Sequence, residues 1–156
     1  MASKKGIAIT AAIVAAIVGA SSLVWLIPQS SPGMTSSEII SDVYARHNDL
    51  AANVESRLEQ WQAGNVSSQD MLTQISAARA DIQEMQKQIR DARPEAEWRQ
   101  SFNLYTQALE TFLEFLGAAE TRVNSGDVSD SPEIEDLKKR WRDYVDQSVE
   151  TMPIAS

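Results

Sequence analysis

The strongest constraint on the fold is the spacing of apolar residues in the second half of the chain. From residue 71 to 92, and again from 98 to 123, apolar side chains recur at alternating intervals of three and four. This period places them on one face of an α-helix, whereas a strand has a period of two. The positions are Met71, Ile75, Ala78, Ile82, Met85, Ile89 and Ala92, then Trp98, Phe102, Tyr105, Leu109, Phe112, Leu116, Ala119 and Val123. Because each apolar face needs partners, the pattern predicts a helical bundle.

Capping residues set the boundaries of the first two helices. Thr35 and Glu38 form a capping-box pair, which predicts a first helix running to about residue 63, before Gly64-Asn65. Its inner positions are Ile40, Val43, His47, Leu50, Val54 and Trp61, with Arg57 as the one charged interruption. The second helix is expected over residues 68–92.

Pro94 stands between the second and third apolar stripes. Proline fits the first turn of a helix, and Glu95 and Glu97 suit the positive end of the helix dipole. The alternative is one long helix over residues 68–123 with a kink at Pro94. We expect the break, because a compact core needs the chain to reverse there.

A fourth helix follows the turn-forming residues 124–130. Ser131, Pro132 and Glu133 supply a cap, a first-turn proline and a first-turn acid, and Pro153 ends the helix. Its apolar positions are Ile134, Leu137, Trp141, Val145 and Met152, with Glu135/Lys139 and Asp136/Arg140 as i,i+4 pairs on the solvent side.

The four stripes are joined by short connections and predict an all-α, antiparallel four-helix bundle over residues 38–152. The alternative is a three-helix core with the last helix packed across it. A linker over residues 28–37 precedes the bundle, and a tail over residues 153–156 follows it.

An uncharged apolar run occupies residues 6–27, directly after Lys4 and Lys5. As a helix it would be about 33 Å long, enough for a bilayer core of about 30 Å. The basic flank favours a cytoplasmic position for residues 1–5, and Trp25 suits the opposite membrane interface. We therefore expect a single-pass membrane anchor with the C-terminal domain outside the cytoplasm.

Two alternatives remain for this run. In a cleaved secretory signal, Val18-Gly19-Ala20 would be a small-residue cleavage site, although the run continues beyond the usual length of about 7 to 15 residues. The sequence Lys4-Lys5-Gly6 before Ile7 resembles the processing site of archaeal type IV prepilin-like proteins. That resemblance implies cleavage after the glycine with the apolar helix retained.

Charge and residue content exclude several classes of function. Beyond residue 28 the chain carries 12 basic and 22 acidic residues, a charge that repels nucleic acid. With no cysteine there is no disulfide, thiolate metal site or thiol nucleophile. One histidine cannot supply the two Glu-x-x-His motifs of a di-iron bundle. Without a nucleophile elbow or a phosphate loop, neither enzyme activity nor a cofactor is expected, and no small-molecule ligand either.

Two weak metal patterns remain. His47 and Met152 are expected near one end of the bundle, and together they resemble the axial haem ligands of soluble b-type cytochromes, with the helices exchanged. We instead expect a buried histidine that is hydrogen-bonded to a neighbour.

Residues 127–133 carry oxygen-bearing side chains at alternate positions, as in the first half of an EF-hand loop. However, Lys138 replaces the glutamate at position twelve and Pro132 replaces the central glycine. Capping and solvation explain these residues better than calcium does. The candidates for weak cation binding are Asp127, Asp130 and Glu133.

Two features of the expected surface concern modification and partners. Asn65 begins the one N-x-S/T sequon and lies in the loop between the first two helices, which makes it a glycosylation candidate. Leu104, Leu113 and Phe115 widen the apolar arc of the third helix beyond one seam. These three residues are candidates for docking another subunit, and a wide core face is the favoured alternative.

The first thirty residues, MASKKGIAITAAIVAAIVGASSLVWLIPQS, resemble the start of small single-span proteins of ammonia-oxidising archaea. The resemblance implies an archaeal cell surface and a role as accessory subunit of a membrane complex such as ammonia monooxygenase. Together with the residues, it favours a non-enzymatic, membrane-anchored interaction or scaffold protein with protein partners at the membrane. The alternatives are a ligand- or metal-binding bundle outside the cytoplasm and a prepilin-like surface protein.

Overall fold

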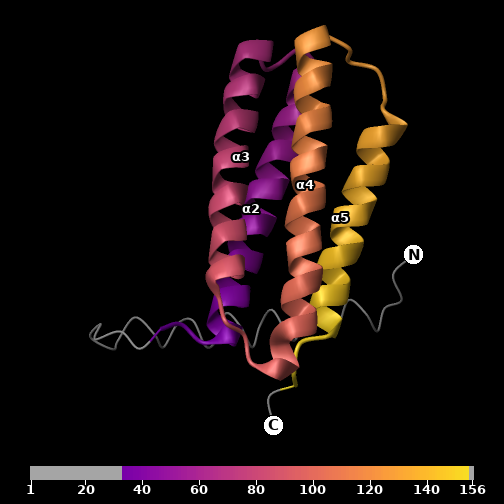
Figure 1. Ribbon diagram of the computed structural model, residues 1–156. Helices are drawn as coiled ribbons and strands as arrows, with labels where there is room; N and C mark the ends of the chain where they lie inside the picture. Colours follow the sequence, from indigo (N-terminus) through magenta and orange to yellow (C-terminus); the bar gives the residue numbers. More distant parts are fainter. Residues whose placement is uncertain (1–32, 155–156) are drawn as a thin grey trace.

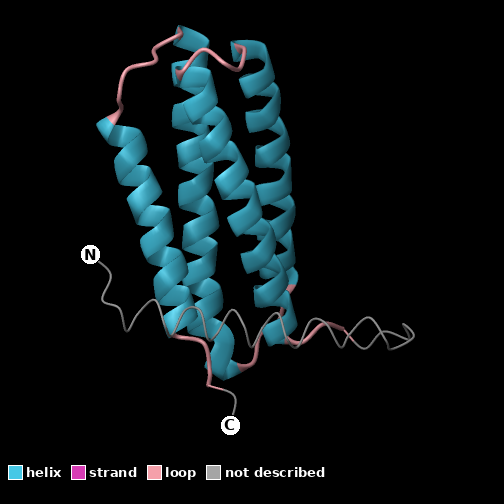
Figure 2. Cartoon of the chain, turned by 180° about the vertical axis from the view of Figure 1, so that it is seen from behind, coloured by secondary structure: helices cyan, strands magenta, loops and turns pink. Residues whose placement is uncertain are grey.

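The computed structural model describes residues 33–154, which form a bundle of antiparallel helices (Figure 1). The elements are α2 (Ser36–Gln62), α3 (Ser68–Asp91), a 3-10 turn η1 (Ala96–Trp98), α4 (Arg99–Ser125) and α5 (Pro132–Glu150). Figure 2 shows only helices and loops in this part of the chain. The all-α bundle and its four long helices are therefore confirmed.

The expected membrane segment over residues 6–27, with Lys4, Lys5 and Trp25, lies outside the described residues. Within residues 33–154, no helix combines the length and apolar character that crossing a bilayer requires.

Helix α2 begins as its sequence predicts. The Thr35 hydroxyl accepts a hydrogen bond from the Glu38 N–H at 3.2 Å, and the Glu38 carboxylate accepts one from the Thr35 N–H at 2.7 Å. Leu50 is half-buried against the core, but the expected inner face omits Ala51 and Leu58, which are buried. A period of 3.6 residues requires a step of four at both places.

The chain reverses between α3 and α4, so the break at Pro94 is confirmed and the long kinked helix is excluded. The prediction that Pro94 lies in the first turn of a helix is wrong. Ala92 is already extended with ψ 142°, and the helical residues resume only at Ala96. Proline disfavours the helical conformation in the residue before it, so α3 cannot continue through Arg93 into α4.

Helix α5 starts with the expected cap, as the Ser131 hydroxyl accepts a hydrogen bond from the Ile134 N–H at 3.3 Å. The helix ends at Glu150, so Met152 lies beyond it. On the solvent side, Asp136 and Arg140 approach to 4.0 Å as predicted, whereas Glu135 pairs with Lys138 at 3.0 Å instead of with Lys139.

Helices adjacent in sequence pack against each other, which makes α4 the neighbour of both α3 and α5. We call one end of the bundle proximal, where α2 starts, α3 joins α4, and α5 ends. The opposite end, with the α2–α3 turn and the α4–α5 loop, is distal (Figure 1). The seam between α2 and α5 lacks the close helix packing of the other three.

Candidate docking site at the distal end

The three docking candidates on α4 do not form an exposed apolar face. Phe115 is completely buried, which corrects the prediction that it contacts a partner. Leu113 is half-buried against the core, and Leu104 is also half-buried. Because α4 packs between α3 and α5, its apolar arc has to be wider than one seam needs. The wide arc is therefore a core face.

His47 is fully buried within a cluster of aromatic rings from three helices. Its Nδ1 lies 3.0 Å from the Tyr105 hydroxyl, which confirms the expected hydrogen bond. The ring centroids of Phe112 and Trp141 lie 4.9 and 5.2 Å from its own. Burial lowers the pKa of His47 to about 4, so the imidazole is neutral at physiological pH.

The arrangement does not bring together the histidine–methionine pair of a haem site. His47 packs beside Trp141, and Met152 lies eleven residues further along, about 16 Å at a helical rise. The space around the imidazole is taken by aromatic side chains of this chain. We interpret His47 as part of the core.

The acidic stretch before α5 also does not assemble a cation site. The Asp127 carboxylate accepts hydrogen bonds from the hydroxyl and N–H of Ser129 at 2.6 and 3.0 Å, and these bonds lower its pKa. Asp130 and Glu133 are exposed, and Ser131 caps α5. Within residues 33–154 no three histidine or carboxylate side chains lie close enough to share a metal ion.

Asn65 is exposed in the turn between α2 and α3, at the distal end. Its N–H donates to the Gln60 carbonyl at 2.8 Å, which fixes the turn and leaves the side chain at the surface. The Ser67 hydroxyl of the same sequon caps α3 by accepting from the Asp70 N–H at 3.1 Å. Glycosylation of Asn65 stays a prediction.

One surface depression is a hollow of about 500 Å³ between the distal halves of α2, α4 and α5. We call it the distal hollow. Its floor includes the buried side chains of Leu58, Phe115 and Ile134. Its remaining lining residues are Glu55, Glu59, Gln62, Arg122, Asp130, Ser131, Pro132, Glu135 and Lys138. Apolar atoms thus lie at the base and polar groups around the rim.

The α4–α5 connection creates this hollow. Gly126 ends α4 in the left-handed conformation, with φ 69°, and the following loop runs to the cap at Ser131. Figure 1 shows the first turn of α5 lower than the last turn of α4 and displaced from the neighbouring helices. The displacement leaves the distal part of the α2–α5 seam without helix packing.

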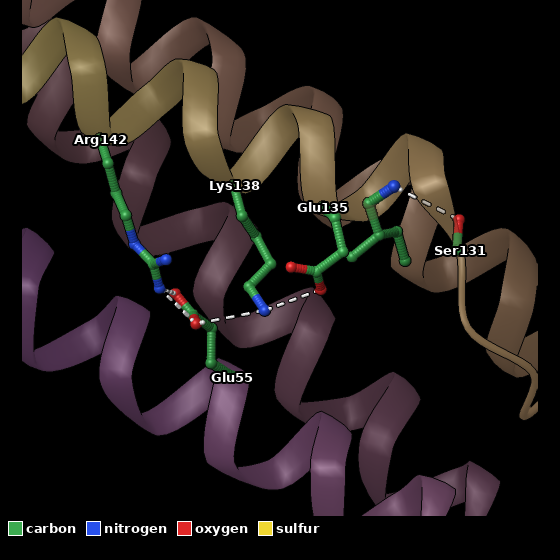
Figure 3. Close-up of polar contacts among 6 residues, drawn as sticks. Glu55, Ser131, Glu135, Lys138 and Arg142 are labelled. Atoms are coloured by element: carbon green, nitrogen blue, oxygen red, sulfur yellow. Dashed lines mark hydrogen bonds and ion pairs between the residues drawn. The ribbon is translucent and has the colours of Figure 1, made fainter. Parts of the chain in front are cut away.

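Ion pairs that involve three lining residues of the hollow bridge the α2–α5 seam (Figure 3). One guanidinium nitrogen of Arg142 lies 2.6 and 2.7 Å from the two carboxylate oxygens of Glu55. Lys138 lies 3.6 Å from Glu55 and 3.0 Å from Glu135. The side chains of Glu55 and Lys138 are only 17% and 18% exposed, so this network is partly shielded from water.

Three charged groups at the hollow remain without such partners. The Nη2 atom of Arg122 is buried and has no hydrogen-bond partner among the described residues. Glu59 and Asp130 form no ion pair within residues 33–154 and are exposed. The hollow therefore offers an apolar floor and two carboxylates that have no ion-pair partner within residues 33–154.

The sequence predicted Asp130 as a candidate for weak cation binding, not for docking, and gave no role to Arg122 or Glu59. These residues lie on three different segments, and only the displaced start of α5 brings them together. The helical periodicity contains no signal for that displacement.

Comparison with known proteins gives no further guidance, because no family model, curated protein or solved structure matches this chain.

Proposed function

We propose that this chain is a non-enzymatic, membrane-anchored protein whose helical bundle docks a partner protein outside the cytoplasm. In this proposal it is a scaffold or accessory subunit of a membrane complex. The apolar run over residues 6–27 is the anchor, and the distal hollow is the docking site. One observation carries the docking: the α2–α5 seam is bridged by ions and leaves an open, apolar-floored hollow.

The charges at the hollow favour a particular partner chemistry. Beyond residue 28 the chain has ten more acidic than basic residues, and Glu59 and Asp130 on the rim lack ion-pair partners among the described residues. A segment that presents an apolar side chain beside a lysine or arginine would fill the floor and pair with these carboxylates.

The size of the hollow fits an interaction of modest strength. A hollow of about 500 Å³ accommodates a few side chains of a partner. Anchoring both proteins in one membrane raises their effective concentration, so modest contacts are sufficient. The N-terminal resemblance makes an ammonia monooxygenase-type complex the first complex in which to look for the partner.

A charge-reversal experiment tests the docking. The chain is extracted from native membranes in mild detergent, and copurifying proteins are compared between the native chain and the double variant Glu59→Lys/Asp130→Lys. We expect the double variant to lose a partner that the native chain retains. The control is Asp81→Lys, which reverses an exposed charge on α3 away from the hollow.

A strictly monomeric native particle would contradict the proposal, as would a partner that copurifies equally with the double variant. A photo-crosslinker at position 59 identifies the partner directly, and its product should be absent when the crosslinker is at position 81.

A further inference from the structure

The proximal end differs from the rest of the surface in the side chains that it exposes. Only three large hydrophobic side chains are exposed within residues 33–154, and two of them belong to this end. Met34, just before α2, is 52% exposed, and Ile154, just after α5, is 94% exposed. Trp98, in the connection between α3 and α4, is half-buried at the same end. This combination is typical of surfaces that contact a lipid interface.

Free cations surround these apolar groups. Arg90, Arg93 and Arg99 are exposed, and none of them forms an ion pair within the described part of the chain. Glu97 and Glu150 at this end are also exposed and form no ion pair within residues 33–154, whereas two other neighbouring carboxylates are already engaged. Asp91 pairs with Lys87 at 2.6 Å, and Glu95 accepts a hydrogen bond from the Ser36 hydroxyl. The guanidinium groups are therefore available to phosphate, which they bind in a bidentate manner.

The proximal end is also the end that a membrane anchor at residues 6–27 would hold close to the bilayer. Six residues, 28–33, connect the apolar run to the structured part, and a chain of that length reaches at most about 20 Å. Helix α4 has 27 residues and spans about 40 Å, so the distal end cannot be held at the same short distance in an upright bundle.

Hydrogen bonds make this end a fixed platform. The Ser148 hydroxyl donates to the Ser101 carbonyl at 2.8 Å, and the hydroxyls of Ser101 and Thr151 lie 3.1 Å apart. Together with the bond from Ser36 to Glu95, they tie the starts of α2 and α4 to the end of α5.

From these observations we propose that the proximal end of the bundle rests on a phospholipid surface. Met34, Trp98 and Ile154 enter the boundary between headgroups and acyl chains, and the three arginines contact lipid phosphates. The inference rests on the proposed membrane anchor. It adds an orientation in which the bundle stands upright and presents the distal hollow at the end farther from the lipid.

Because the chain contains no cysteine, single introduced cysteines can be labelled without background. The full chain is reconstituted in phosphatidylcholine/phosphatidylglycerol vesicles, with an environment-sensitive fluorophore at Met34→Cys, Ile154→Cys or Val128→Cys. Val128 is 53% exposed in the distal loop and is the matched control for Met34. We expect blue-shifted emission and quenching by lipid-borne spin labels at positions 34 and 154, and water-like emission at 128.

Charge reversal tests the role of the arginines. The double variant Arg93→Glu/Arg99→Glu should reduce lipid quenching at position 34, whereas Arg57→Glu, on the exposed side of α2, should leave it unchanged. Equal, water-like emission at positions 34, 154 and 128 in a chain that resists carbonate extraction would overturn the orientation while leaving the anchor intact. Release of the chain by carbonate would contradict the anchor, and the orientation with it.

Discussion

His47 combines complete burial with a titratable side chain, so its protonation is coupled to folding. In the unfolded chain a histidine binds a proton near pH 6.5, but burial lowers its pKa in the folded protein to about 4. Stability is therefore full above pH 6.5 and is lost as the pH falls from there to about 4. We expect the free energy of unfolding to decrease by about 2 kcal/mol by pH 5 and about 3 kcal/mol by pH 4. Urea unfolding at a series of pH values measures this change.

Other groups affect different parts of this pH range. Hydrogen bonds lower the pKa of Glu38 and Asp127 in the folded protein. The stability that these two carboxylates contribute is therefore lost only as the pH falls through and below the usual carboxylate range. Burial raises the pKa of Asp146, which acts in the opposite direction to His47. The interval from pH 7 to 5 is thus dominated by His47. The variant His47→Leu should be nearly flat over that interval, and an unchanged slope would contradict the assignment.

The Tyr105 hydroxyl is the one hydrogen-bond partner of His47 in the described structure. The variant Tyr105→Phe keeps the ring but leaves the buried imidazole without a partner on either nitrogen. We expect a loss of about 1–3 kcal/mol, the cost of an unsatisfied buried polar group. Thermal unfolding at pH 8 measures this loss of stability, because His47 is neutral at that pH in both the folded and the unfolded chain. The control is Tyr44→Phe, whose half-buried ring lies beside Tyr105, and which should change stability by less than about 0.5 kcal/mol.

Two glycines, Gly117 inside α4 and Gly126 at its C-terminal end, allow the effect of backbone conformation on stability to be measured apart from that of side-chain packing. A Cβ at Gly117 or at Gly126 would meet no atom within 4 Å, yet only Gly126 has a positive φ, 69°. The variant Gly126→Ala should therefore destabilise the bundle by about 1 kcal/mol, because alanine is strained in the left-handed region. Gly117→Ala should stabilise it by up to about 1 kcal/mol, since alanine favours the helix interior. Chemical denaturation of both variants checks the opposite signs.

Glu55 links α2 to α5 through Arg142 and Lys138. Because its carboxylate is mostly shielded and has two cationic partners, Glu55→Gln should cost about 1–3 kcal/mol, more than an exposed pair. Hydrogen exchange should accelerate in the amides of α5 before those of α3. Glu114→Gln breaks an exposed contact to Arg140 at 3.8 Å and is the control. Equal exchange in the two variants would mean that the ion pairs do not hold the seam.

The helices themselves were predictable, because period, caps and turn residues are local properties of the sequence. The capping box at Thr35, the cap at Ser131 and the reversal near Pro94 all lie within one or two turns of the residues that cause them. The role of Phe115 was not predictable in the same way. Whether an apolar residue beside the main stripe is core or surface depends on how many neighbours its helix has.

The distal hollow depends on the same non-local information. Its residues come from α2, α4 and α5, and they meet only because the first turn of α5 is displaced from the α2–α5 seam. That displacement has no sequence signature within a single helix, which explains why the sequence predicted the fold but not the site.

In the whole molecule, the two ends of the bundle differ in construction. Hydrogen bonds tie the proximal end together, whereas the distal end carries the α4–α5 loop and the hollow. The core itself is continuous from Ile40 to Val145 and includes side chains from all four long helices. The core that residues 33–154 form thus has the elements of an independent folding unit.

This continuity predicts that residues 33–156, produced without the preceding segment, fold as a helical, cooperative unit. Burying nearly every large hydrophobic side chain leaves three exposed ones in residues 33–154, too few for aggregation to dominate. We expect a strongly helical circular dichroism spectrum, dispersed methyl resonances and one unfolding transition that is the same by fluorescence and circular dichroism. Trp61 and Trp141 report the core directly, because they are 5% and 4% exposed. A compact state that binds hydrophobic dyes and lacks fixed side-chain packing would show that the bundle requires the N-terminal segment to fold.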